Sequence, residues 1–458
     1  MKTVREITNI KTTILASARQ CTVYQSAVHT ARQDTTGYIP IQQDRIKISF
    51  PDSSTMSDLP LSTAKEIVTL RGHTEDVVSL CWLGDSEVLV TGSYDSTARV
   101  WSPGQPEAQA VLQHGHDVTQ PGIVGCMDWS TTSLLATGCG SGEVAIWSGE
   151  GEKLATLSGH SDYINTIKFS DNGRLLVTGT YSFCRIWGEE EGSWTCSQVI
   201  LCDDGVLALV WRGEQEFFTG GGNGTIHHWR VGQQTPVQTL TGHSSYVFSL
   251  AWEDTGLLAS GSEDRTVRLW RPDSQSPIVA PPLLGHQGPV QEVVWGPGTP
   301  AILASWDDSP GLRLWNGEGD LLRVLPCSTD EMDPSFSGHI SFSPNGLLAC
   351  RGREVQVWRP RSGQLEARLQ VEGGKVCWGV GGHRLAVLTQ EERTWKVVKV
   401  FDTQKLGTLR SLRKITLRAV ASYLRWNEDR DQKDLKDVLD NLKIPRILQK
   451  ELQLYLSN

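Results

Sequence analysis

The chain has 458 residues, of which 38% are apolar and 17 are tryptophan, so it can bury a large core. Its formal net charge of −9, with no stripe dominated by Lys and Arg, argues against nucleic acid as the principal ligand. We expect a protein of the cytoplasm or nucleus with free thiols and no membrane contact, because the sequence has no membrane-length apolar run, no hydrophobic N-terminal signal and no Cys-x-x-Cys pair among its ten cysteines.

Residues 1–65 form a segment that is rich in Ser, Thr and Gln and contains no repeat. The first 33 residues hold Arg and Lys but little acid, which gives them a weak likeness to an organelle transit segment. We favour a flexible N-terminal tail over that alternative. Within it, Ile46–Phe50 is a candidate for pairing with a strand edge.

The segment from residue 66 to residue 403 is repetitive. A strand-like run closes on an aromatic residue eight times, at intervals of 40 to 46 residues. The closing residues are Trp101, Trp147, Trp187, Trp229, Trp270, Trp315, Trp358 and Phe401. Short runs of Val, Leu, Ile and Trp, interrupted by Gly, Asp, Asn or Pro, predict antiparallel strands rather than helices.

Each repeat predicts a four-stranded unit that is apolar on both faces, and such units are buried only when neighbours stack around a central channel. The period therefore predicts an all-β fold, an eight-bladed β-propeller. Glu66–Leu70 is placed to supply the outer strand of the last blade. A seven-bladed ring is the alternative, but it would leave Val376–Phe401 unpaired.

Two repeats share four polar or aromatic residues at fixed places. They are His73, Thr91, Asp95 and Trp101 in the first repeat, and His243, Ser260, Asp264 and Trp270 in the fifth. These residues, with a Gly before each His, resemble the WD-repeat family. That resemblance implies a buried hydrogen-bonded chain with a structural role, and a buried His or Asp must in any case be paired.

Other repeats keep less of this pattern. Gly159-His160 and Gly285-His286 retain the turn, whereas the repeat ending at Trp358 lacks both His and Asp. Ser141 and Asn223 stand where the pattern has Asp. Gly220–Gly224 could hold a phosphate in isolation, but its place between two strands predicts a tight turn with positive φ.

No catalytic motif is visible. The sequence has no Gly-x-Ser-x-Gly elbow, no His-Glu-x-x-His and no phosphate-binding Gly-x-x-x-x-Gly-Lys-Ser/Thr. We therefore expect a non-enzymatic protein without a cofactor or a bound metal.

WD-repeat propellers commonly bind partners with the loops before the first strand and between the second and third strands of a blade. In this chain those positions hold Asp76, Tyr94, Tyr163, Tyr181, Tyr246, Glu263 and Trp306. Four of the eight tyrosines fall there, and aromatic anchors dominate binding energy, so we predict a face that recognises protein targets. The alternatives are that the tyrosines only cover the blade tips, or that partners use the rim or the N-terminal tail.

Residues 404–458 change to helical periodicity, which predicts three short helices, the last beginning at Pro445. Their order resembles a SOCS box. Ser411-Leu412, Thr416 and Val420 match the family's elongin-binding motif, and Leu442, Ile444 and Pro445 match its cullin-side motif. Thr416 stands where the family usually has Cys, and Lys443 where it has Pro.

The SOCS-box resemblance implies a substrate-recognition subunit that binds elongin B and C and a cullin of an E3 ubiquitin ligase. The alternative is a WD-repeat scaffold in a transcriptional corepressor or signalling complex. The propeller also resembles the transducin-beta-like corepressor proteins, at Asp95–Trp101, in the insertion after His114 and in the last blade from Glu372. In that case the C-terminal helices would pack on the propeller or dimerise.

Overall fold

The computed structural model describes residues 64–406, apart from 85–86, 103, 115–121, 203, 308, 310, 328–339, 352–353, 380, 392–393 and 405, together with residues 23–24 and 47–48. Leu61–Leu406 is one compact unit, and the terminal segments form another. In the second unit, β1 Val23–Tyr24 pairs with β2 Lys47–Ile48, which lies inside the predicted Ile46–Phe50 strand. The described residues contain no helix that is long and apolar enough to cross a membrane.

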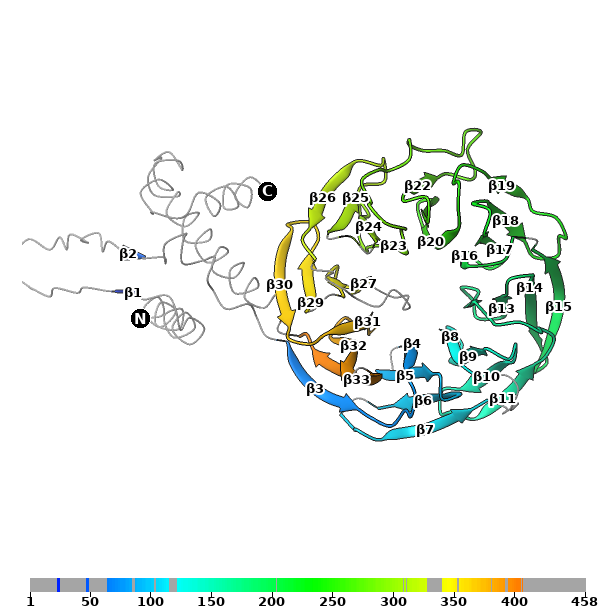
Figure 1. Cartoon of the computed structure of the whole chain (residues 1–458), viewed down its shortest axis with the longest axis horizontal. Helices are drawn as coiled ribbons and strands as arrows, with labels where there is room; N and C mark the ends of the chain where they lie inside the picture. The colour runs from blue at the N-terminus through cyan, green and yellow to red at the C-terminus, as the bar shows by residue number, and fades with distance from the viewer. Residues whose placement is uncertain are drawn as a thin grey trace, which may run out of the picture. The chain divides into compact units, whose positions relative to one another are not determined.

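Within the described part of the compact unit, eight antiparallel sheets form a ring, and their strands succeed one another from the central axis to the rim (Figure 1). Blades one and two comprise β4 Val77–Leu83, β5 Val88–Ser93, β6 Thr97–Trp101, β7 Ala108–Gln113, β8 Val124–Trp129, β9 Leu134–Cys139, β10 Val144–Ser148 and β11 Lys153–Leu157. Blades three and four comprise β12 Thr166–Phe169, β13 Leu175–Gly179, β14 Phe183–Glu190, β15 Ser193–Leu201, β16 Ala208–Arg212, β17 Glu216–Gly220, β18 Ile226–Arg230 and β19 Gln238–Leu240.

The other half of the ring repeats this order. Blades five and six comprise β20 Val247–Glu253, β21 Leu257–Ser262, β22 Val267–Trp270, β23 Glu292–Trp295, β24 Leu303–Trp306, β25 Leu312–Trp315 and β26 Leu321–Leu325. Blades seven and eight comprise β27 Ile340–Phe342, β28 Leu348–Cys350, β29 Val355–Arg359, β30 Gln364–Leu369, β31 Gly373–Trp378, β32 Arg384–Glu391, β33 Thr394–Asp402 and β3 Lys65–Leu70. The prediction of an all-β, eight-bladed propeller is confirmed.

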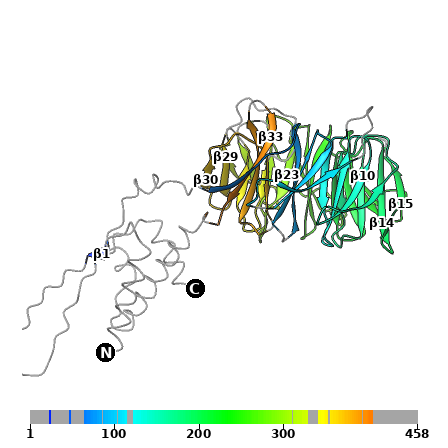
Figure 2. The same ribbon diagram turned by 90° about the horizontal axis from the view of Figure 1, so that it is seen from below.

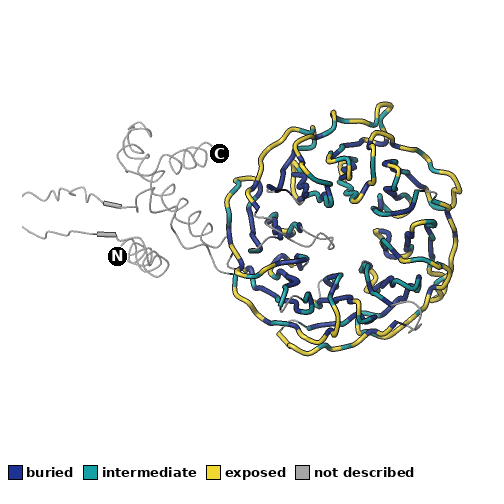
Figure 3. Tube along the Cα trace, in the orientation of Figure 1, coloured by how far each residue is buried: buried dark blue, intermediate teal, exposed yellow. Residues whose placement is uncertain are grey.

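The core lies between the blades. Each of eight hydrophobic clusters combines residues of two neighbouring sheets, as where Val90 and Ala98 of blade one meet Leu135 and Trp147 of blade two. Buried residues gather along the inner and middle strands, and exposed residues follow the rim (Figure 3). Each blade has apolar residues on both of its faces, so its burial depends on both neighbouring blades.

The ring closes through the N-terminal strand of the compact unit. The order of the last sheet is β3-β33-β32-β31, and Leu70 of β3 pairs with Val398 of β33. Glu66–Leu70 therefore supplies the outer strand of the last blade, as the repeat predicts. On the inner side, Trp82 Nε1 donates a hydrogen bond to Cys377 O at 3.0 Å, joining blade one to blade eight.

Blade five is the irregular one, with three named strands. Its outer segment makes only two isolated bridges, Val267 to Leu283 and Trp270 to Ile278. Prolines at positions 277, 281 and 282 lie in this segment. A proline has no N–H to donate to a strand ladder, which explains the interruption.

Candidate functional site

The loops on one face of the ring are held by a chain of hydrogen-bonded side chains. Blade one contains this chain in its full form. His73 Nδ1 lies 2.8 Å from Asp95 Oδ2, and His73 Nε2 lies 2.7 Å from Thr91 Oγ1. Trp101 Nε1 donates to the same Thr91 Oγ1 at 2.9 Å. An ionised Asp95 selects the tautomer with hydrogen on Nδ1, so Nε2 accepts from the Thr91 hydroxyl. The loop before β4 is thereby tied to the turn between β5 and β6.

The carboxylate of this chain is kept ionised. Burial acts to raise the pKa of Asp95, but hydrogen bonds from His73 and Thr97 outweigh it and hold that pKa well below its ordinary value. Blade five repeats the arrangement. His243 lies 2.8 Å from Asp264 and 2.7 Å from Ser260 Oγ, which accepts from Trp270 Nε1 at 2.9 Å.

Blade six contains a third chain, whose acid was not singled out from the sequence. His286 Nε2 lies 2.7 Å from Ser305 Oγ, and His286 Nδ1 lies 2.9 Å from Asp307 Oδ1. Trp315 Nε1 donates to Ser305 Oγ at 2.8 Å. Asp307 follows Ser305 by two residues, whereas Asp95 follows Thr91 by four, so a search at the usual spacing misses it. Against the effect of burial, hydrogen bonds from His286 and Ser309 lower the pKa of Asp307 to about 2.

Blade two has another substituted acid. His114 Nε2 lies 2.8 Å from Thr137 Oγ1, which accepts from Trp147 Nε1 at 2.7 Å. The acid beside this histidine is Glu143, and not Ser141 at the position that the pattern assigns to Asp. Its Oε1 lies 3.4 Å from His114 Nδ1, which is an ion-pair distance rather than a hydrogen bond. Contact with His114 is the main cause that lowers the pKa of Glu143 to about 2.

Blade three keeps only part of the chain. His160 Nε2 lies 2.7 Å from Thr178 Oγ1, which accepts from Trp187 Nε1 at 2.9 Å. Within the described residues, His160 Nδ1 is buried without a hydrogen-bond partner. Burial first, and then the nearby charge of Arg185, lower the pKa of His160 to about 4. This histidine is therefore neutral near pH 7.

The turn Gly220–Gly224 has the predicted positive φ at Gly224, where φ is +84°. A Cβ added to Gly224 would lie 2.6 Å from His243 O and 2.9 Å from Ser245 O of the next blade. The glycine is thus required twice, for its conformation and for its close approach to a neighbouring backbone. The strands run between the two faces of the ring (Figure 2). Because every blade has the same antiparallel strand order, the turns between second and third strands all lie on the same face.

The tyrosines at these loops are accessible. The exposed fractions are 46% for Tyr94, 37% for Tyr163, 60% for Tyr181 and 46% for Tyr246. We call these four residues the tyrosine face. Sequence reasoning missed one aromatic neighbour, Phe248, which is 37% exposed and stacks on Tyr246 with ring centroids 6.1 Å apart.

Tyr163 is the most enclosed member of the tyrosine face. A Cβ added to Gly125 of β8 would lie 2.0 Å from the Tyr163 hydroxyl oxygen, so Gly125 makes room for it. Burial raises the pKa of the Tyr163 hydroxyl, and nearby Tyr94 and Tyr181 add to that rise. Tyr94 and Tyr181 therefore both lie near the Tyr163 hydroxyl.

Three further residues that we predicted on this face differ in their surroundings. Glu263 is exposed, and its carboxylate accepts from Ser245 Oγ. Asp76 is half-buried, and its Oδ1 accepts from Trp395 N at 2.9 Å. The prediction for Trp306 is wrong, because its side chain is only 1% exposed and packs in the core between blades six and seven.

The six residues predicted to bind an adaptor lie outside the described residues. They are Leu412, Thr416, Val420, Leu442, Ile444 and Pro445. Within the described part of the chain, no group of three or more His, Cys, Asp or Glu is arranged to hold a metal ion.

The repeat itself matches a known family model. The model "WD domain, G-beta repeat" matches residues 64–102, 151–188 and 234–271. Three segments of the ring therefore match the WD40 repeat, and the ring itself is an eight-bladed β-propeller. Each match begins at the outer strand of one blade and ends with the third strand of the next blade, as from β19 to β22. The first match accordingly begins with β3, which is the outer strand of the last blade.

The chain is similar to several WD40-repeat proteins. It is 29% identical over 394 residues to the WD40 repeat-containing protein HOS15 of Arabidopsis thaliana, covering 80% of this chain and 62% of that protein. It is 32% identical over 212 residues to human F-box-like/WD repeat-containing protein TBL1X, covering 44% and 36%. It is 26% identical over 326 residues to the SIR4-interacting protein SIF2 of Saccharomyces cerevisiae, covering 63% and 58%. The matches therefore span less than two thirds of each relative.

A solved structure supports the fold. The crystal structure of the C-terminal WD40 domain of Sif2 has a TM-score of 0.63 and 23% identity, covering 75% of this chain and 99% of that one. The designed protein Ika8 has a TM-score of 0.60 and 21% identity. At such low identity these likenesses concern the fold alone.

Proposed function

We propose that this protein is a non-catalytic scaffold, which captures a protein partner on its tyrosine face as part of a nuclear corepressor or signalling assembly. The observation that carries the proposal is the exposure of Tyr94, Tyr163, Tyr181 and Tyr246 on loops of one face. Similarity to TBL1X and to the SIR4-interacting protein SIF2 supports an assembly of this kind. The free cysteines of the described residues suit a reducing compartment such as the nucleus.

The physical case rests on rigid presentation. An exposed tyrosine offers a large contact area but loses little side-chain entropy on binding, and such residues dominate binding energy at interfaces. The loop before β20, which carries Tyr246, is tied through His243 to Asp264 and Ser260. A partner therefore meets aromatic side chains on loops that need little further ordering.

The test is affinity purification from nuclear extract of the full chain and of a variant with Tyr94, Tyr181 and Tyr246 all changed to Ala. We expect the wild-type protein to retain a set of partners that the triple variant loses. The matched control replaces two exposed rim residues, Leu154 and Leu201, by Ala, which leaves the tyrosine face intact. Retention of every partner by the triple variant would reject this face as the binding surface.

A second candidate is the substrate receptor of an elongin–cullin ubiquitin ligase. It rests on the SOCS-box-like sequence from Ser411 to Leu456 and on nothing in the described structure. Copurification of elongin B and C with the wild-type chain, and their loss with Leu412→Asp, would favour it. Their absence from the wild-type purification would reject the ubiquitin-ligase candidate, and the scaffold proposal would remain.

A further inference from the structure

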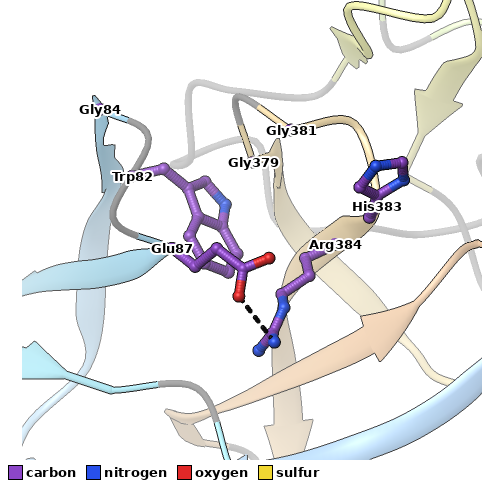
Figure 4. A pocket seen from close by; sticks show the side chains of 7 residues that line it. All are labelled: Trp82, Gly84, Glu87, Gly379, Gly381, His383 and Arg384. Atoms are coloured by element: carbon purple, nitrogen blue, oxygen red, sulfur yellow. Dashed lines mark ion pairs between the residues drawn. The ribbon is translucent and has the colours of Figure 1, made fainter.

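A hollow of about 160 Å³ lies at the seam where the ring closes, between blade one and blade eight. Its walls come from the turn between β4 and β5 and from the turn between β31 and β32 (Figure 4). The lining residues are Trp82, Gly84, Glu87, Gly379, Gly381, His383 and Arg384. Both turns join a first strand to a second strand, so the hollow lies at the opposite ends of the strands from the tyrosine face.

The size of the hollow restricts its occupant. Sites for drug-sized ligands and cofactors usually enclose about 300–1,000 Å³. A hollow about half the size of the smallest of these accommodates one side chain rather than a cofactor. Three of its lining residues are glycines, which keep the walls free of side chains.

The guanidinium of Arg384 in the lining is only partly paired. Arg384 Nη2 pairs with Glu87 Oε2 at 2.7 Å, whereas Arg384 Nη1 is buried without a hydrogen-bond partner among the described residues. The indole N–H of Trp82 is already used on Cys377 O, so the ring offers only its surface. Glu87 is the one carboxylate in the lining, and its side chain is 47% exposed.

Glu87 also has an unusual backbone, with φ of +56° in a residue that is not glycine. Such a conformation is uncommon and costs free energy, and it is retained where the surroundings require it. Here it accompanies a carboxylate that reaches across the seam to the guanidinium of Arg384 (Figure 4). The ion pair with Glu87 shows that the Arg384 guanidinium can bind a carboxylate at this position.

We propose that this hollow is a second binding site, which takes the carboxylate side chain of an Asp or Glu from a protein partner. The incoming carboxylate supplies acceptors to the Arg384 guanidinium, with Trp82 as an apolar wall, and displaces Glu87 toward solvent. A guanidinium binds a carboxylate through two parallel hydrogen bonds, which gives the site its selectivity for an acid over an amide. This proposal does not depend on the tyrosine face.

The experiment uses N-acetyl-glutamate N-methylamide as the probe, N-acetyl-glutamine N-methylamide as its matched neutral analogue, and ligand-observed NMR of the full chain. We expect the glutamate probe to bind at least fivefold more tightly than the glutamine probe. Glu87→Gln should tighten binding of the glutamate probe at least threefold, because the competing carboxylate is gone. Arg384→Gln should abolish binding.

A steric variant separates binding from folding. A Cβ added to Gly379 would lie 3.5 Å from Trp82 Cδ2, an ordinary contact, so Gly379→Ala narrows the hollow without a clash. We expect this variant to fold normally and to bind the glutamate probe at least fivefold more weakly. Tyr181→Ala, on the other face, should bind it as the wild type does.

Three results would overturn the proposal. The first is equal affinity of the wild type for the two probes. The second is no binding of the glutamate probe by either the wild type or Glu87→Gln. The third is unchanged binding in both Arg384→Gln and Gly379→Ala. If Glu87→Gln lowers the melting temperature and does not strengthen binding, the Glu87–Arg384 pair serves only to hold the seam.

Discussion

Asp76 and Trp395 are 319 residues apart in the chain, yet Asp76 Oδ1 accepts a hydrogen bond from Trp395 N at 2.9 Å. This contact joins the loop that enters blade one to the outermost of the three consecutive strands of blade eight, β33. The carboxylate that sequence reasoning assigned to partner recognition is therefore engaged in closing the ring.

We predict that Asp76→Ala lowers the free energy of unfolding by about 1–3 kcal/mol, because it leaves the Trp395 N–H without its acceptor. Asp76→Asn should lose less, since its amide oxygen can still accept. Urea unfolding of both variants measures the difference. Equal losses would mean that the charge of Asp76, rather than this hydrogen bond, supports closure.

The chain of side chains in blade five should act as a unit. We expect His243→Ala and Asp264→Ala each to cost about 1–3 kcal/mol, and the double variant to cost less than their sum, because the first change already strands the second residue. Thermal and urea unfolding of all four proteins completes the cycle. Strict additivity would show that the two residues stabilise blade five independently.

His160 should make stability depend on pH. Its pKa is about 4 in the folded protein against an ordinary 6.5, so between these values the unfolded chain binds more protons and stability falls as the pH is lowered. In His160→Gln this loss between pH 7 and pH 5 should be smaller by on the order of 1 kcal/mol, after screening by solvent. Urea unfolding at both pH values tests it, with Leu201→Ala as the control that keeps the wild-type dependence.

Gly224 should tolerate no side chain. We expect Gly224→Ala to lower the free energy of unfolding by more than about 2 kcal/mol, through its positive φ and its close approach to His243 O. Gly256 is the matched control, because it also has positive φ, at +94°, but has nothing within 4 Å of an added Cβ. Urea unfolding of both variants measures the two losses in free energy of unfolding. The amount by which the loss at Gly224 exceeds that at Gly256 is the steric contribution. Equal losses would show that there is no steric contribution.

Replacing an aromatic residue of the binding loops should affect stability only where that residue is buried. Replacing the exposed Tyr181 or Tyr246 by Ala should change the free energy of unfolding by no more than about 0.5 kcal/mol while weakening partner capture. Trp306→Ala, in contrast, should cost about 3–5 kcal/mol, because it empties a core position. Thermal unfolding and affinity purification of each variant provide the two measurements. A stable Trp306→Ala would contradict its placement in the core.

The sequence by itself determined the eight-bladed ring, its closure by Glu66–Leu70 and a tight turn with positive φ within Gly220–Gly224. These features follow from a regular period and from local turn chemistry, which can be read without knowing any long-range contact. The positions of His243 and Asp264 could be singled out for the same reason, since their spacing recurs between blades.

Only the tertiary structure decided which acid serves blades two and six. Glu143 and Asp307 stand away from the usual position, and the Nδ1 side of each histidine faces whichever carboxylate the turn brings within reach. Packing between blades, which no single repeat encodes, placed Trp306 in the core. The hollow beside Arg384 arises in the same way, because its walls are about 300 residues apart in the chain and meet only when the ring closes.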